Sequence, residues 1–238
     1  MFTFKQFTVH DEQCGMKVGT DGTLLGAWAP VSGVSEGPVL DVGTGSGLIA
    51  LMLAQRCPEA TVLGIDSDEA AALQAADNFA RSPWPNRLLA KHIPLQTLAE
   101  VGSLAHSFRL IVSNPPYFVD SLKNPDLGRR AARHTDSLSF PELLDGCARL
   151  LHPEGTLALI LPAEAEQTIL TLAAERDLTP SSITHVHTRT YKPAKRVLLA
   201  LAHGTHESHE THELVLQDES GTPRSAAYQS LCEDFYLN

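Results

Sequence analysis

The sequence predicts an α/β fold built on a doubly wound, mostly parallel sheet. Apolar runs at 39–42, 61–65 and 108–112 have the length and composition of buried parallel strands, and helical patterns lie between them. The first run ends in a glycine-rich turn and the third in Asn-Pro-Pro-Tyr. A strand, a glycine turn and a helix N-terminus in succession are where a doubly wound sheet holds a nucleotide.

Further elements follow these runs in order along the chain. Helices are predicted at 48–55, 68–80, 140–151 and 164–176, and further strands at 88–93 and 156–161. Two last core strands, at 181–190 and 196–202, are expected to pair as an antiparallel hairpin. Together these segments predict a sheet of seven strands.

Small additions are expected before and after this core. Phe2 and Phe4 share one face of an expected N-terminal edge strand and Phe7 lies on the other, which favours covering the core over stacking on bases. Thr20 or Asp21 is expected to cap a helix with the apolar residues Leu24, Leu25 and Trp28. An edge strand is predicted at 214–216 and an amphipathic helix at 226–235, with Tyr228, Leu231 and Phe235 on one stripe.

The length of 238 residues suits a single domain. We expect an N-terminal cap at 1–36, a core at 37–203, and a C-terminal strand and helix at 204–238. No apolar run is long enough to span a membrane, and the N-terminus lacks the apolar stretch of a signal peptide. Four cysteines without paired spacing suit a reduced cytoplasmic protein.

The net charge of −10 argues against broad, nonspecific binding of nucleic acid, and leaves open a local basic patch. Two segments are candidates for such a patch. The polar segment 117–137 carries Arg129, Arg130 and Arg133, and the turn of the predicted hairpin carries Lys192, Lys195 and Arg196 beside Tyr191. Histidines also recur every three residues from 203 to 212, but the surrounding glycine, serine and threonine favour an exposed loop over a metal site.

The glycine-rich turn has the form Asp-x-Gly-x-Gly-x-Gly, and its candidate ligand residues are Asp41, Gly43, Gly45 and Gly47. Glycine permits positive φ and lets a ligand approach closely, and Ser46 is expected to cap the following helix. Leu48 stands where a dinucleotide-binding motif has its third glycine. The turn instead resembles the first motif of class I S-adenosylmethionine (SAM) methyltransferases. Asp66, 19 residues after Gly47, is suited to accept hydrogen bonds from a ribose.

A second motif, Asn114-Pro115-Pro116-Tyr117, resembles the catalytic motif of methyltransferases that act on adenine, guanine or glutamine nitrogen. Two prolines stiffen this turn and give the Asn114 amide a defined direction. Many such enzymes place an acid after the third strand to hold the cofactor's adenine amine. Here the sequence is Lys91-His92-Ile93-Pro94, so His92 is the substitute that the segment offers.

Segments outside these motifs resemble one family, the bacterial valine-tRNA adenosine-37 methyltransferases. The matching blocks are Phe4-Lys-Gln-Phe7, Met16-Lys-Val-Gly-Thr-Asp-Gly22, Leu24-Leu-Gly-Ala-Trp-Ala-Pro30, Ser113-Asn-Pro-Pro-Tyr117, Arg196-Val-Leu-Leu-Ala200 and the ending Tyr228…Phe235-Tyr-Leu237. The resemblance implies SAM-dependent methylation of the exocyclic N6 amine of adenosine 37 in a valine tRNA, by a cytoplasmic enzyme that we expect to be a monomer without a metal.

The resemblance also implies roles for single residues. Asn114 and Pro115 accept hydrogen bonds from the adenine amine, while Tyr117 stacks on the base. Asn114 is also expected to contact the cofactor, at the same site as Asp66. Lys17, Thr20 and Asp21 help to close the cofactor pocket. Three alternatives stay open: methylation of a protein glutamine or of another RNA, a SAM-binding protein without catalysis, and, least favoured, an NAD oxidoreductase.

Overall fold

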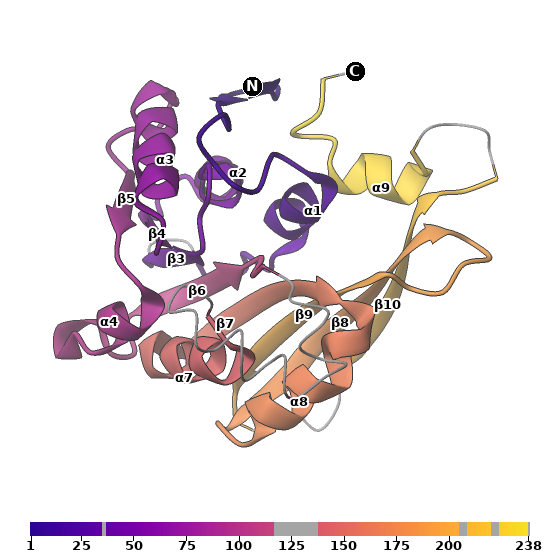
Figure 1. The fold of residues 1–238 in the computed structure, drawn as a ribbon. Coiled ribbons are helices and arrows are strands. Elements are labelled where there is room, and N and C mark those ends of the chain that lie inside the picture. The colour runs from indigo at the N-terminus through magenta and orange to yellow at the C-terminus, as the bar shows by residue number, and fades with distance from the viewer. Residues whose placement is uncertain (35–36, 117–137, 205–208, 220–223, 238) are drawn as a thin grey trace.

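The computed structural model describes residues 1–34, 37–116, 138–204, 209–219 and 224–237. Within them, eight strands form one sheet in the order β10–β8–β9–β7–β6–β3–β4–β5 (Figure 1). The strands are β3 (Val39–Val42), β4 (Val62–Asp66), β5 (Leu88–His92), β6 (Phe108–Ser113), β7 (Leu151–Pro162), β8 (Leu178–Arg189), β9 (Arg196–His203) and β10 (Glu210–Gln217).

The sheet is parallel except at one strand. β9 runs antiparallel to both of its neighbours, β7 and β8, which confirms the predicted hairpin of β8 and β9. The prediction of seven strands is one short, because the expected edge strand at 214–216 is the second half of a longer strand, β10, that pairs in parallel with β8. Its first half is a polar run, Glu-Thr-His-Glu, and carries no apolar signal.

Helices cover both faces of the sheet (Figure 1). One face carries α1 (Thr20–Trp28), α2 (Leu48–Arg56), α3 (Glu69–Arg81) and α9 (Ala226–Leu231), and the other carries α4 (Leu95–Ala99), α7 (Phe140–Leu150) and α8 (Glu166–Ala174). Two short 3-10 turns follow α4 and precede α8, respectively: η1 (Gly102–Leu104) and η2 (Ala163–Ala165). A separate two-stranded sheet, β1 (Phe2–Thr3) with β2 (Thr8–Val9), lies at the N-terminus.

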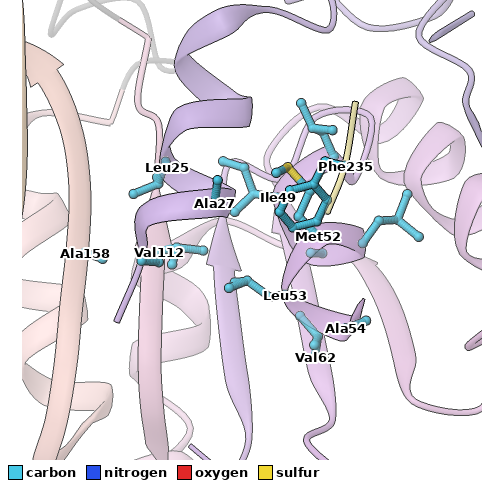
Figure 2. Close-up of a cluster of buried hydrophobic side chains, with 14 of the residues drawn as sticks. Leu25, Ala27, Ile49, Met52, Leu53, Ala54, Val62, Val112, Ala158 and Phe235 are labelled. Carbon is cyan, nitrogen blue, oxygen red and sulfur yellow. The ribbon is translucent and has the colours of Figure 1, made fainter. Parts of the chain in front are cut away.

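The sheet divides the apolar interior into two clusters because alternate strand residues point to opposite faces. In β6, Leu110 and Val112 belong to the cluster under α1 and α2, while Ile111 belongs to the cluster under α7 and α8. Figure 2 shows the first cluster, in which Met52 and Phe235 pack together above the strands. Complete burial of β3 and the central part of β6 explains their continuous apolar sequences.

The N-terminal phenylalanines differ from the expected arrangement. Phe4 and Phe7 do not lie on opposite faces; their rings stack with centroids 4.8 Å apart, and both are buried. A turn causes this, because Phe4 N donates to Phe7 O across Lys5 and Gln6. Lys5 N in turn donates to Phe235 O, so the first and last segments of the chain are joined. These two phenylalanines therefore contribute to the core, as expected.

Three helix ends also differ from the sequence prediction. Gly19 is the N-cap of α1, and neither Thr20 nor Asp21 caps it. Gly47, with φ of 81°, is the N-cap of α2; the expected cap Ser46 is buried, and its carbonyl accepts from Asn78 Nδ2. The terminal helix α9 stops at Leu231 rather than at residue 235. No helix among the described residues is long and apolar enough to cross a membrane.

Candidate active site

Three strand ends meet at the carboxyl edge of the sheet. The register aligns Val42 of β3 with Ile65 of β4 on one side and with Ser113 of β6 on the other. The glycine turn after β3 therefore lies between Asp66, which ends β4, and Asn114, which follows β6. The parallel topology thus brings the glycine turn and the Asn-Pro-Pro turn together.

Two adjoining cavities open at this edge. The larger, of about 500 Å³, is lined by Gly43, Gly45, Asp66, Asn114 and residues 93–96, among others. The smaller, of about 390 Å³, is lined by residues 16–22, by the glycine turn and by the start of α2. Both cavities share four residues, which mark the junction between them: Met16, Gly43, Gly45 and Asn114.

The glycines of the turn serve two different purposes. Gly43 and Gly45 have φ of 70° and 54°, and a Cβ built on either meets nothing within 4 Å, so their open side belongs to the cavity walls. Gly47 lines neither cavity. A Cβ there would stand 2.4 Å from Phe79 Cε1, which gives this glycine a packing role between α2 and α3. Of these three glycines, only Gly43 and Gly45 therefore leave open space at the cavities.

Asp41 lies beneath the turn and is fully buried. Its Oδ2 accepts from Thr44 Oγ1 at 2.7 Å and from Ala50 N at 3.2 Å, so it ties the turn to α2. Burial raises the pKa of this carboxyl to about 7. Asp41 lines neither cavity, and the structure gives it a positioning role for the turn.

Asp66 lines the larger cavity at the end of β4. One carboxylate oxygen accepts from Gly45 N and the other from Asp68 N, each at 2.9 Å. These two bonds fix the carboxylate beside the glycine turn. An acceptor placed there is suited to ribose hydroxyls, as the spacing from Gly47 predicts.

The smaller cavity contains the N-terminus of α1. No side chain of the described residues caps this helix, and Gly43 to Ser46 and the first residues of α2 line the same cavity. Backbone N–H groups at a helix N-terminus favour a carboxylate ligand. Lys17 and Thr20 also line it, but Lys17 Nζ donates to the carbonyls of Asp11 and Glu12 at 2.6 and 3.1 Å.

Asn114 stands at the junction of the two cavities. Its Nδ2 donates to Met16 Sδ at 3.7 Å, and Pro115 behind it is buried. Pro116 lines the larger cavity. Tyr117 lies outside the described residues, as do Arg129, Arg130 and Arg133.

His92 and Arg196 have protein partners in the structure. His92 Nε2 lies 3.0 Å from Ser67 O, and the residue lines neither cavity. Arg196 Nε donates to Asp21 Oδ2 at 2.8 Å, so the structure pairs a residue expected at RNA with one expected at the cofactor. Lys192 and Lys195 are in the hairpin turn, where Lys192 is exposed, and Tyr191 is 70% exposed.

Sequence reasoning missed several residues of the larger cavity: Cys14, Gly15, Leu138, Gln96 and Glu142. They come from segments outside the strand ends, and no motif marks them. Met16 had a signal, because it begins one of the blocks shared with the family. Among the described residues, no three His, Cys, Asp or Glu side chains are grouped so as to hold a metal ion.

Comparison with known proteins identifies the family of this chain. The model of the methyltransferase small domain matches residues 24–172. The chain is 45% identical to a tRNA1(Val) (adenine(37)-N6)-methyltransferase from Parabacteroides distasonis, over 99% of this chain and 97% of the relative. It is 46% identical to the protein of the same name from Aeromonas hydrophila, with the same coverage of both chains.

The chain belongs to this methyltransferase family. Solved structures support the fold alone. A predicted O-methyltransferase from Agrobacterium tumefaciens superposes with a TM-score of 0.69 at 20% identity, covering 90% of this chain and 96% of that one. A putative RNA methyltransferase from Pyrococcus horikoshii gives 0.54 at 15% identity, covering 87% and 92%. This family member is an enzyme, a methyltransferase.

Proposed function

We propose that this methyltransferase transfers a methyl group from SAM to the exocyclic N6 amine of adenosine 37 in the anticodon loop of a valine tRNA. The observation that carries the proposal is the position of Asn114, at the junction of a cavity suited to a nucleoside and one suited to a carboxylate. The full-length similarity to relatives with that name supports the choice of substrate.

The residues present fit the cofactor. Asp66 would bind the ribose in the larger cavity, and the uncapped start of α1 would bind the methionine carboxylate in the smaller one. Gly43 and Gly45 leave room for the part of SAM that joins its ribose to its methionine carboxylate. When bound, SAM supplies an electrophilic methyl group with its own leaving group.

Asn114 and Pro115 would act on the target amine. The amine of adenine is a poor nucleophile, because its lone pair is delocalised into the ring. If Asn114 Oδ1 and the Pro115 carbonyl accept its two N–H groups, both stabilise the positive charge that develops on nitrogen. Tyr117 would fix the plane of the base by stacking. An anticodon loop exposes this base at lower cost than a duplex does.

The hairpin of β8 and β9 supports an RNA substrate. β8 runs parallel to the strands that end at the site, so the turn between β8 and β9 lies at the same edge of the sheet. Arg189, Lys192 and Lys195 of this turn would contact phosphates, with Tyr191 beside them. We also infer action in the cytoplasm, since all four cysteines are free and buried. The same proposal takes the enzyme to act as a monomer.

The test separates the proposed substrate from the alternatives. Bulk tRNA from a strain that lacks the gene is incubated with enzyme and SAM labelled in the methyl group, then digested to nucleosides. We expect label in N6-methyladenosine that maps to position 37 of a valine tRNA. A parallel incubation replaces the tRNA with purified release factor, a protein substrate that tests the glutamine alternative. Label in another nucleoside, or in this protein instead of tRNA, would overturn the proposal.

A further inference from the structure

A buried asparagine connects two segments that line the cavities. Asn78 lies on α3, is 1% exposed and lines neither cavity. Its Oδ1 accepts from His10 N at 3.0 Å, and its Nδ2 donates to His10 O at 2.7 Å and to Ser46 O at 2.8 Å. One side chain therefore holds both backbone groups of His10 and one carbonyl of the glycine turn.

These three bonds fix the direction of the Asn78 carboxamide. Its NH₂ carries two donors, whereas its oxygen is only an acceptor. Because the NH₂ faces two carbonyls and the oxygen faces an N–H, a half-turn of the amide would set acceptor against acceptor and donor against donor. Removing the side chain would leave the buried Ser46 carbonyl without this donor, which costs more than the bond itself contributes.

The first of the two segments is the chain that follows β2, residues 10–18, here called the wall segment. Residues 14–16 line the larger cavity, and residues 16–18 line the smaller one. The wall segment is closed on itself, because Asp11 Oδ2 accepts from Val18 N at 3.0 Å. Its first residue, which Asn78 holds, is therefore the point at which α3 anchors a wall of both cavities.

The second segment is the glycine turn, which two adjacent residues of α3 contact. Asn78 donates to the Ser46 carbonyl, and the Phe79 ring fills the space beside Gly47 where a Cβ would stand. Ser46 itself lines the smaller cavity. The helix therefore fixes the turn and the wall segment relative to each other, and Asn78 is bonded to both.

We propose that Asn78 is a positioning residue for the cofactor, which couples the glycine turn to the wall segment so that both become ordered together when the cofactor binds. The inference rests on the proposed placement of SAM, with its ribose at Asp66 and its carboxylate at the start of α1. Asn78 lines neither cavity, so it acts on the cofactor through the backbone groups that it holds. A ligand that orders the turn then also orders His10, which lines neither cavity.

Calorimetry with S-adenosylhomocysteine tests this coupling without any turnover. Asn78→Ala should lose about five- to 150-fold in affinity, the range typical of coupling between two sites. Asn78→Asp keeps the volume of the side chain but sets an oxygen against the carbonyls of His10 and Ser46, so its affinity should also fall. Wild-type affinity in Asn78→Asp would mean that the residue only fills space, and would overturn the inference.

Arg87→Ala is a control matched for the loss of buried hydrogen bonds to the backbone. Arg87 donates to the carbonyls of Ala54, Cys57 and Ala60 at 2.8–2.9 Å, at the end of α2 that lies away from the glycine turn. This variant should unfold at lower urea concentration than the wild type, as Asn78→Ala should, but keep wild-type affinity for S-adenosylhomocysteine. An equal loss of affinity in both variants would show general destabilisation instead of coupling.

Hydrogen exchange of the wild-type enzyme tests the coupling even if the Asn78 variants fold poorly. Exchange followed by NMR should slow at the His10 amide when S-adenosylhomocysteine is added, together with the amides of the glycine turn. In Asn78→Ala with saturating ligand, the turn should still be protected and His10 should not. Protection of the turn without any change at His10 in the wild type would overturn this inference alone, whereas unchanged affinity in Asp66→Ala would overturn the cofactor placement and this inference with it.

Discussion

Arg196 Nε donates to Asp21 Oδ2 at 2.8 Å, which ties the first residue of β9 to the first turn of α1 across 175 residues of sequence. Each side chain is about one-third exposed. The ion pair matches the charges of two residues that the sequence suggested for different ligands, Asp21 for the cofactor and Arg196 for RNA. It holds the uncapped start of α1 beside the smaller cavity, so its main consequence concerns the position of that helix.

We predict that Arg196→Ala weakens SAM binding while leaving the salt dependence of tRNA binding unchanged. The charge of Arg196 is already matched by Asp21, so phosphate contacts should not depend on it. As a partly exposed ion pair, it should contribute only about 0.2–1 kcal/mol to global stability. Calorimetry and salt titration check this. The exchanged pair Asp21→Arg with Arg196→Asp should recover part of the SAM affinity; a salt slope reduced by one unit in Arg196→Ala would contradict the assignment.

Asn114→Ala should lower the rate of methyl transfer by about 10²–10³-fold, the effect of removing one acceptor that stabilises developing charge. SAM affinity should change little, because the amide is expected to contact mainly the target amine. Single-turnover kinetics with saturating tRNA measure the rate, and calorimetry measures SAM binding. Turnover near the wild-type level would rule out this role for Asn114.

Asp66→Ala should weaken SAM binding by about 1.5–3 kcal/mol, the contribution of hydrogen bonds to a charged acceptor. The rate at saturating SAM should fall much less. Asp77→Ala is a matched control, since this aspartate lies on α3 and pairs with Arg81 on the helix surface. Equal SAM affinity in both variants would remove the ribose role from Asp66.

Neutralising Arg189, Lys192 and Lys195 together should weaken tRNA binding and reduce its salt slope by about one unit for each phosphate that the variant no longer neutralises. KM for tRNA should rise more than kcat falls. Lys91→Ala serves as the control, because this lysine is exposed and lies on β5, four strands beyond β7 in the sheet order and away from β8 and β9. The triple alanine variant of Arg129, Arg130 and Arg133 tests the other basic segment in the same assay. Normal tRNA affinity in both triple variants would show that neither segment contacts RNA.

Stability should fall with rising pH through the titration of His187. The backbone carbonyl of Lys192 and the carboxylate of Glu213 raise the pKa of His187 in the folded protein. A raised folded pKa means that the stabilisation is complete below the unfolded pKa and is lost as pH rises through the folded one. Urea unfolding of the wild type and of His187→Gln, over the pH range between the unfolded and the folded pKa of His187, checks the sign of this pH dependence. The two curves should converge at higher pH, and a constant offset would contradict the prediction.

The sequence alone determined the succession of core strands and helices, the glycine turn and the Asn-Pro-Pro turn. These features are local. A fully buried strand such as β3 or β6 needs a continuous apolar run, Gly43 and Gly45 need positive φ, and two prolines restrict their own backbone. Because the carboxyl ends of parallel strands meet at one edge of a sheet, the motifs also predicted that Asp66 and Asn114 share a site.

Only the tertiary structure decided which partner each polar residue takes. Asp21 looked like a helix cap and pairs with Arg196, while Gly47 looked like a ligand contact and makes room for Phe79. Gln96 carried no motif and lines the larger cavity together with Glu142 of another helix. The physical reason is that a side chain's charge or size states what kind of partner it needs, while the long-range packing of helices on the sheet determines which partner is within reach.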